Sequence, residues 1–249
     1  MSELSFGVHV VPRGPEHGRD LLLRMEDTEF DTAWLIEPGE RQLDPWVTLG
    51  AMANETEEVE LGMLIADMSV RDPAHLARFA TTVDQLSGGR FILGLGEEQP
   101  SRLPRLPEQV SVVDQLLRES GESVQQPRPP LLVAGNDEHS IAAAVSHGDT
   151  WNAWIDQADS ELAYSRVTEC VALLEKALDK SERSGSTLAR SLLMLPGATD
   201  PWSSDSAIPV IVEQYRTLGF TEFIFSPPRV DQMREFLRIG TGVLSSLRD

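Results

Sequence analysis

Cysteine is almost absent from this chain of 249 residues. The one cysteine, Cys170, falls in a segment with helical patterning, so no disulfide can form within the chain. We interpret Cys170 as a small buried apolar residue. The chain has no C-x-x-C motif, and its histidines lack the spacing of metal ligands; they are His9, His17, His75, His139 and His147. The sequence therefore predicts no metal site.

Basic residues are also scarce. The chain has 21 lysines and arginines against 40 aspartates and glutamates, and its net charge is −19. Such a surface repels nucleic acid and anionic membranes, so we expect neither as a partner. The near absence of lysine favours a haloarchaeal-type chain adapted to high salt, where charges are screened within ~3 Å at molar ionic strength. The alternative is an ordinary acidic protein.

Long apolar runs are missing as well. No stretch reaches the ~18 consecutive apolar residues of a transmembrane helix. Residues 1–5 carry no basic segment followed by an apolar run, so we expect no signal peptide. These absences predict a cytoplasmic protein.

The sequence does contain a regular alternation of short apolar segments and amphipathic segments. The expected strands are residues 5–11, 32–37, 59–66, 90–94, 130–134, 150–155, 189–195 and 221–226. The expected helices are residues 16–28, 44–56, 72–87, 109–120, 140–147, 161–183, 205–218 and 230–247.

This alternation predicts a parallel sheet of the α/β class. Eight strand–helix repeats in about 250 residues match a closed (β/α)8 TIM barrel, which we expect to be a single domain over residues 1–249. An open doubly wound sheet is the alternative. It is slightly disfavoured because no G-x-G-x-x-G follows the first strand.

The stretch over residues 71–96 is more specific than the alternation. Asp72 and Pro73 predict a helix start, Gly88 and Gly89 predict its end, and a strand follows up to Gly96. This stretch, with its L-S-G-G-R and G-L-G motifs, resembles the luciferase-like family of flavin and deazaflavin monooxygenases and reductases. The match is dense over residues 44–96 and weaker over 130–151.

The resemblance implies a (β/α)8 barrel with FMN or coenzyme F420 at the carboxyl ends of its strands. The cofactor passes a hydride or activates oxygen, and the protein orients it beside a small-molecule substrate. Ala66 and Asp67 correspond to the position behind the cofactor ring, which often carries a non-prolyl cis peptide. Gly96 would lie beside the ring, and Glu97 resembles a glutamate placed to act on protons there.

The resemblance also implies a phosphate site in the turn over residues 135–140, where backbone N–H groups and a helix N-terminus hold the cofactor phosphate. Gly135, Asn136 and Ser140 are the candidate contacts there, and Ala134 and Thr150 are further candidates for binding the cofactor. Asp137 and Glu138 place negative charge in the same turn, which opposes a phosphate unless the carboxylates point outward. An ordinary capped helix explains the turn equally well.

His9, near the end of the first strand, is a further catalytic candidate, with a structural histidine as the alternative. The chain also departs from the family. Pro100 replaces an expected asparagine, the loop after Gly96 is short, and no Asp-His pair follows the second strand, which indicates a shortened member. Two other functions remain open: a non-catalytic barrel without cofactor that serves binding or assembly, and a phosphate-binding enzyme without flavin. We expect a homodimer through helices 44–56 and 72–87.

Overall fold

The strands close into a single parallel barrel in chain order. The computed structural model describes residues 4–10, 15–36, 43–99, 101–181, 183, 185–195, 197 and 200–248. The strands are β1 (Ser5–Val10), β2 (Thr32–Leu35), β3 (Glu60–Asp67), β4 (Phe91–Gly96), β5 (Leu131–Ala134), β6 (Thr150–Ile155), β7 (Ala189–Met194) and β8 (Glu222–Phe225). Because β1 pairs with both β2 and β8, the sheet is closed, which confirms the (β/α)8 barrel and excludes the open sheet.

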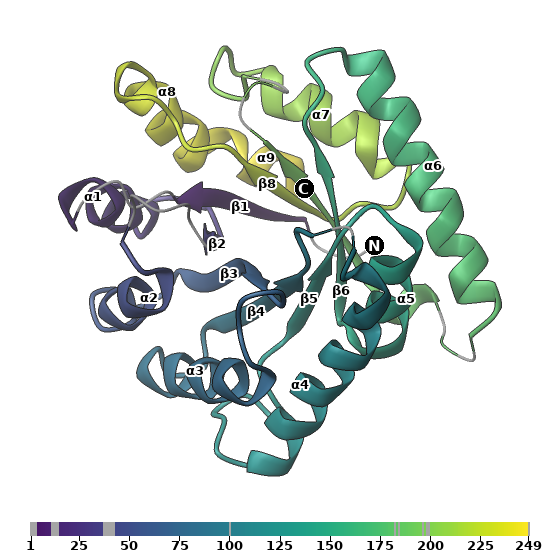
Figure 1. The fold of residues 1–249 in the computed structure, drawn as a ribbon. Helices are drawn as coiled ribbons and strands as arrows, with labels where there is room; N and C mark the ends of the chain where they lie inside the picture. Colours follow the sequence, from purple (N-terminus) through teal and green to yellow (C-terminus); the bar gives the residue numbers. More distant parts are fainter. Residues whose placement is uncertain are drawn as a thin grey trace.

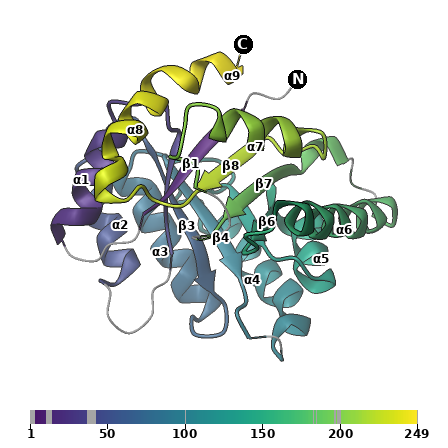
Figure 2. The ribbon, with the colours of Figure 1, turned by 90° about the horizontal axis from the view of Figure 1, so that it is seen from above.

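Helices surround the strands, as Figures 1 and 2 show from two directions. They are α1 (Pro15–Met25), α2 (Pro45–Ala53), α3 (Pro73–Leu86), α4 (Leu106–Ser120), α5 (Glu138–His147), α6 (Ser160–Asp179), α7 (Ala207–Arg216), α8 (Met233–Arg238) and α9 (Ser245–Arg248). Short 3-10 turns lie between β4 and α4 (Leu103–Arg105), between α6 and β7 (Gly185–Thr187) and between β8 and α8 (Val230–Gln232).

The helix ends follow the capping chemistry that the sequence predicts. Asp44 caps α2, and Asp72 caps α3 by accepting from the N–H groups of Ala74 and His75. Gly88 and Gly89 follow α3 with φ of 68° and 90°, a conformation that favours glycine.

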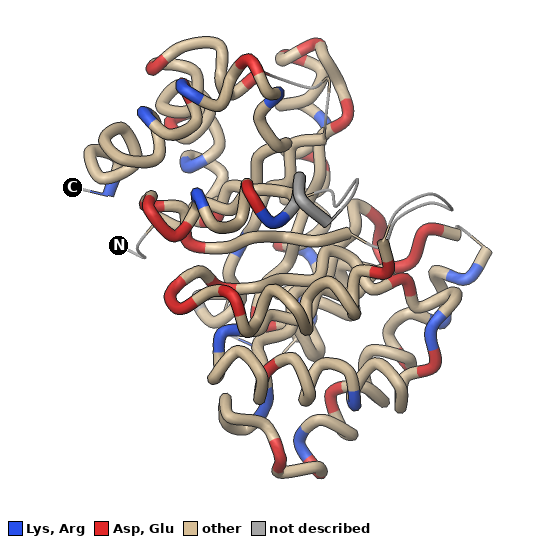
Figure 3. The backbone as a smooth tube through the Cα atoms, turned by 90° about the vertical axis from the view of Figure 1, so that its left-hand side faces the viewer, with Lys and Arg blue, Asp and Glu red and all other residues tan. Residues whose placement is uncertain are grey.

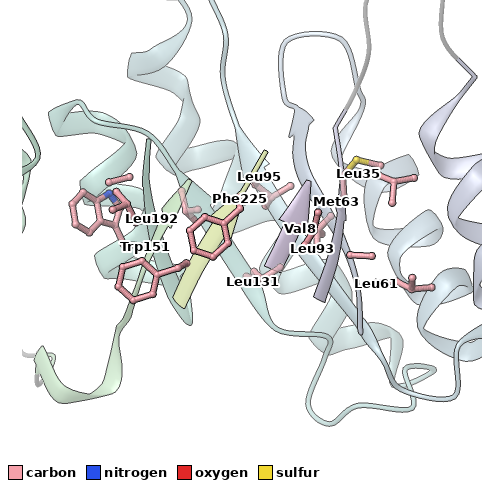
Figure 4. Packing of buried hydrophobic residues seen from close by; sticks show 14 of the residues in the cluster. Val8, Leu35, Leu61, Met63, Leu93, Leu95, Leu131, Trp151, Leu192 and Phe225 are labelled. Atoms are coloured by element: carbon pink, nitrogen blue, oxygen red, sulfur yellow. The ribbon is translucent and has the colours of Figure 1, made fainter. Parts of the chain in front are cut away.

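Two apolar layers build the core, because successive strand residues point to opposite sides of the sheet. The outer layer, part of which is drawn in Figure 4, packs the strands against the helices and includes Val8, Leu93 and Phe225. The inner cluster fills the barrel and consists of Trp34, Leu64, Leu132, Ala134, Leu193 and Ile224. Trp34 lies against Gly62, where an added Cβ would be 2.1 Å from the indole.

The last predicted helix, over residues 230–247, is divided into several pieces. A 3-10 turn precedes α8, and a π-helical turn over Ile239–Val243 separates α8 from α9. Gly240 packs against Phe30 and Thr28, and its carbonyl accepts a hydrogen bond from the N–H of Glu29. This close contact with the chain before β2 is where the regular helix is interrupted.

Acidic and basic residues are interspersed over the face drawn in Figure 3. None of the helices in the described ranges is both long and apolar enough to cross a membrane. The predicted dimer surface, now helices α2 and α3, exposes apolar side chains: Val47 is 75% exposed, and Phe79 and Leu86 are also exposed. The dimer stays a prediction.

Candidate active site

A cavity of about 590 Å³ lies at the carboxyl ends of the strands. This is the end of a (β/α)8 barrel at which active sites are found. Of the predicted site residues, six line the cavity: His9, Glu97, Ala134, Gly135, Asn136 and Ser140. The other four, Ala66, Asp67, Gly96 and Thr150, are not among its lining residues.

His9 points into the barrel from β1. Its neighbours Val8 and Val10 belong to the outer layer, so strand alternation turns the imidazole inward. The residue is 3% exposed, and neither ring nitrogen has a hydrogen-bond partner among the described residues. Burial lowers the pKa of His9 to about 4, so the ring is neutral at pH 7. It can therefore donate one hydrogen bond and accept another.

Asn152 faces the same cavity from β6, and sequence reasoning missed it. Its side chain is fully buried, and its amide nitrogen donates to the hydroxyl of Ser191 at 2.9 Å. The amide oxygen has no partner in the described part of the chain. A polar residue between the outer-layer residues Trp151 and Ala153 was the available signal, because alternation turns it inward.

Glu97 follows β4 and also lines the cavity. One carboxylate oxygen accepts a hydrogen bond from the N–H of Gln99 at 2.7 Å. The other oxygen is buried and has no partner among the residues described. Glu97 thus presents an oxygen that could accept a proton or hydrogen bond from a bound molecule.

Apolar side chains form the walls between these polar groups. Leu64, Ile65, Trp154 and Leu193 line the cavity. Trp154 is the most exposed of these four residues, at 38%. Pockets that bind small molecules combine apolar walls with a few converging polar groups in this way.

The non-prolyl cis peptide lies two residues before the predicted position. The non-prolyl cis peptide lies between Leu64 and Ile65, rather than at Ala66 and Asp67. The β3–β4 pairing changes register between Met63 and Ala66, and Ala66 joins the outer layer. Asp67 is buried and accepts hydrogen bonds from the N–H and hydroxyl of Ser69. Leu64 and Ile65 therefore take the place expected for Ala66 and Asp67 at the cavity.

The glycines of β4 serve strand packing. A Cβ at Gly94 would lie 2.2 Å from the carbonyl oxygen of Met63, and a Cβ at Gly96 would lie 2.6 Å from the side chain of Ile65. Gly96 thus makes room for Ile65, where a cofactor ring was expected. Thr150 begins β6, so it lies at the amino end of the barrel, far along the strand from Trp154. Asn152 is the β6 residue that reaches the cavity from inside the barrel.

The predicted phosphate turn between β5 and α5 is held by its own side chains. Asp137 caps α5: one carboxylate oxygen accepts from the N–H groups of His139 at 2.8 Å and Ser140 at 3.1 Å. The other oxygen accepts from the hydroxyl of Ser140 at 2.5 Å. The N–H groups and the hydroxyl expected to bind phosphate are therefore bonded to Asp137.

The rest of the turn is equally well bonded. The Asn136 side chain donates to the carbonyl of Trp154 at 2.9 Å and accepts from its N–H at 3.2 Å. Trp151 donates from its indole to the carbonyl of Gly135 at 2.9 Å. Gly135 has a φ of 149°, and a Cβ there would lie 2.2 Å from the hydroxyl oxygen of Ser140. Only glycine fits without displacing Ser140.

The charged side chains that line the cavity suit an uncharged ring better than a phosphate. Glu97, Glu98 and Asp137 line it, and no lysine or arginine is among its described lining residues. FMN and coenzyme F420 both carry phosphate, and the described residues do not fit that part of either cofactor. The described residues also hold no group of histidine, cysteine and carboxylate side chains suited to a metal ion.

Comparison with known proteins places this barrel in a family. The family model described as luciferase-like monooxygenase matches residues 5–192. A Mycobacterium tuberculosis protein named as a coenzyme F420-dependent oxidoreductase is 31% identical over 144 residues. That match covers 53% of this chain and 41% of the relative, so the chain spans less than half of the relative's length.

Solved structures share the fold along nearly the whole chain. The F420-dependent tetrahydromethanopterin reductase from Methanopyrus kandleri superposes with a TM-score of 0.80 at 14% identity, covering 98% of this chain and 99% of that one. The EDTA monooxygenase from Chelativorans sp. BNC1 gives a TM-score of 0.70 at 14% identity, covering 99% of this chain and 92% of that one. Because the family model matches residues 5–192, which is most of the chain, the chain belongs to the luciferase-like monooxygenase family.

Proposed function

We propose that this protein is an oxidoreductase that binds a flat, uncharged flavin-type or deazaflavin-type ring in the cavity and acts on a small molecule beside it. One observation carries the proposal. His9, Glu97 and Asn152 each direct a buried polar atom without a described partner into the same cavity. Buried polar groups are almost always hydrogen-bonded in a folded protein, so three at one place indicate groups that a ligand satisfies.

The family supports the reaction class. The names of the relatives associate this barrel with F420-dependent oxidoreductases and with monooxygenases. In such enzymes the ring supplies the redox chemistry, whereas the protein binds it, orients it and excludes water.

Different residues of this chain bind the ring and take part in proton transfer. Leu64, Ile65 and Leu193 offer apolar contact to a flat ring. Neutral His9 and the amide oxygen of Asn152 supply hydrogen bonds from the floor of the cavity. Glu97 presents a carboxylate oxygen that can exchange a proton with the bound molecule, which makes it the proposed catalytic acid or base.

A non-catalytic barrel is the second candidate. Asp137 favours it, because this carboxylate bonds the groups that would hold a cofactor phosphate. The two candidates differ in whether the cavity binds a redox ring at all.

A titration with bare rings tests the proposal. Lumiflavin and 5-deazalumiflavin carry neither a ribityl chain nor a phosphate, so their binding depends on the cavity alone. We expect quenching of the fluorescence of one of them and saturation at one ring per chain. Absence of binding by both would support the non-catalytic barrel.

The role of Glu97 is tested with Glu97→Gln. Oxidation of the reduced bound ring by a panel of carbonyl acceptors should slow about 100-fold, because a positioned acid or base contributes about 10²–10⁴-fold. Ring affinity should hardly change. The control is Glu108→Gln, an exposed carboxyl in the first turn of α4. Equal rates for Glu97→Gln and the control would remove Glu97 from the reaction.

A further inference from the structure

The first N–H groups of α5 are bonded to a carboxylate of the chain itself. The first N–H groups of a helix carry partial positive charge and bind anions such as phosphate. Here the carboxylate of Asp137 takes the N–H groups of His139 and Ser140, and its second oxygen takes the Ser140 hydroxyl. The carboxylate therefore occupies the position that a phosphate group would need.

The same turn forms part of the cavity wall. Asp137 and Ser140 line the cavity together with His9 and Asn152, which are both more than nine-tenths buried and have polar atoms without described partners. These atoms point independently to a ligand in the cavity. The ligand's neighbours at the α5 end are thus a carboxylate and donors that are already bonded.

The charge of the residues that line the cavity also disfavours a phosphate. Asp137, Glu97 and Glu98 all face the cavity, and its described lining residues include no basic side chain that would offset them. A phosphate brought to this turn would meet a carboxylate within a few ångströms, where like charges repel strongly. An uncharged ribityl chain would meet no such repulsion.

We propose that Asp137 is a specificity-determining residue that closes the anion site, so that the cavity takes a flavin-type or deazaflavin-type ring without its phosphate in preference to the phosphorylated cofactor. The proposal rests on the proposed function, because it assumes that the cavity binds such a ring. It narrows the ligand class to the unphosphorylated ribityl form.

The test compares two ligands that differ only in the phosphate. Riboflavin and FMN, or 5-deazariboflavin and its 5′-phosphate, are titrated into the whole chain while fluorescence quenching is followed. The titrations use about 0.1 M salt, where the screening length of ~10 Å still exceeds the distance between neighbouring charges in the turn. We expect the unphosphorylated form to bind the wild-type chain at least about tenfold more tightly.

Two variants separate the effect of the Asp137 charge from the effect of the hydrogen bonds that Asp137 makes to the N–H groups of α5. Asp137→Asn removes the charge but keeps an oxygen that can cap the helix, and Asp137→Gly vacates the N–H groups. Asparagine caps about as well as aspartate, and glycine costs only a few tenths of a kcal/mol relative to good caps, so both variants should fold. Affinity for the phosphorylated ligand should rise about tenfold in Asp137→Gly and less in Asp137→Asn. Affinity for the unphosphorylated ligand should change less than about twofold.

Glu138→Gln is the matched control. It removes one negative charge from the next residue of the same turn, but Glu138 is exposed and lines a different surface hollow with Lys176 and Lys180. Its ratio of the two affinities should equal that of the wild type. Inorganic phosphate added as a competitor should displace the phosphorylated ligand from Asp137→Gly only.

The outcomes distinguish this proposal from the proposed function. If the wild-type chain binds the phosphorylated form as tightly as the unphosphorylated form, or if Glu138→Gln changes the ratio as much as Asp137→Gly, this proposal is overturned while ring binding stands. If neither form binds the wild type or any variant, the proposed function itself fails.

Discussion

Arg128 at the amino end of the barrel and His9 at the carboxyl end are buried in opposite ways. At the amino end, Arg128 is 4% exposed in its side chain, yet its guanidinium binds the carboxylates of Asp114 and Asp149 and the carbonyl of His147. At the carboxyl end, His9 is equally buried and has no described partner for either nitrogen. Paired burial indicates structure, whereas unpaired burial at a cavity indicates a place for a ligand.

The carboxyls of the amino end follow the same rule. Burial raises the pKa of Asp31 and Glu60, and it raises the pKa of Glu222 to about 7. Asp31 nevertheless accepts from the N–H of Phe6 at 2.7 Å, and Glu60 accepts from the hydroxyl of Thr32 at 3.0 Å. The side chain of Ser191 acts as a partner of Glu222 and opposes the rise in its pKa. Because all three carboxyls have local partners, their pKa shifts do not mark a second active site.

The largest effect is expected at the amino end. Arg128→Met should lower the free energy of unfolding by about 3–5 kcal/mol, because it removes the buried partner of Asp114 and leaves the carbonyl oxygens of Pro129 and His147 without their donor. Urea denaturation measures the loss, with the exposed Arg19→Met as control. A loss below about 1 kcal/mol would show that this end is not held by its ion pairs.

Two glycine substitutions compare the packing inside the barrel with the packing at its carboxyl end, which we call the mouth of the barrel. Gly62→Ala should cost about 3 kcal/mol, because the new Cβ would lie 2.1–2.6 Å from three ring atoms of buried Trp34. Gly96→Ala should cost about 1 kcal/mol, because it meets the end of the Ile65 side chain, which can move toward the cavity. Thermal unfolding measures both. Equal costs would contradict the view that the mouth is the looser region.

At neutral pH a small effect of opposite sign is expected for His9 at the carboxyl end of the barrel. His9→Leu should raise the free energy of unfolding by about 1 kcal/mol at pH 7.5, because it removes a buried polar group without partners. Because the pKa of His9 is lower in the folded chain than its unfolded value of 6.5, the unfolded state binds the proton first, and the wild type loses stability as the pH falls from 6.5 toward 4. The gap between variant and wild type should therefore widen by about 2 kcal/mol at pH 5.

Urea denaturation at pH 7.5 and pH 5 measures this gap, and the exposed His75→Leu is the control. The control should leave the free energy of unfolding at pH 7.5 within about 0.5 kcal/mol of the wild type. A His9→Leu variant that is destabilised by more than about 1 kcal/mol at pH 7.5 would show that the imidazole has structural partners.

The sequence predicted most of the fold because local chemistry and global pattern agree. Asp72, Pro73 and Gly88 delimit α3 as expected. The alternation of short apolar segments with amphipathic segments predicted every strand of the barrel. Helix boundaries were harder to predict where tertiary contacts intervene. The helix expected to end at Arg183 ends at Asp179, and the Arg183 guanidinium instead donates to the carbonyl of Gly148.

The site was predicted only in part, for two physical reasons. No sequence rule located the register shift between Met63 and Ala66, so the non-prolyl cis peptide was predicted two positions late. The turn at Asp137 was ambiguous because a capping carboxylate and a bound phosphate satisfy the same N–H groups. Only the hydrogen bonds to Asp137 show which of the two the chain itself supplies.

The central claim is that buried polar groups without partners at the carboxyl end of the barrel bind a ligand. Its most direct test is the nuclear magnetic resonance spectrum of the His9 imidazole with and without riboflavin. The ring should be neutral at pH 7, should titrate only near pH 4, and should shift to saturation as riboflavin binds, while exposed His75 stays unchanged. Riboflavin binding that leaves the His9 signals unmoved, or a failure of riboflavin to bind, would contradict the account.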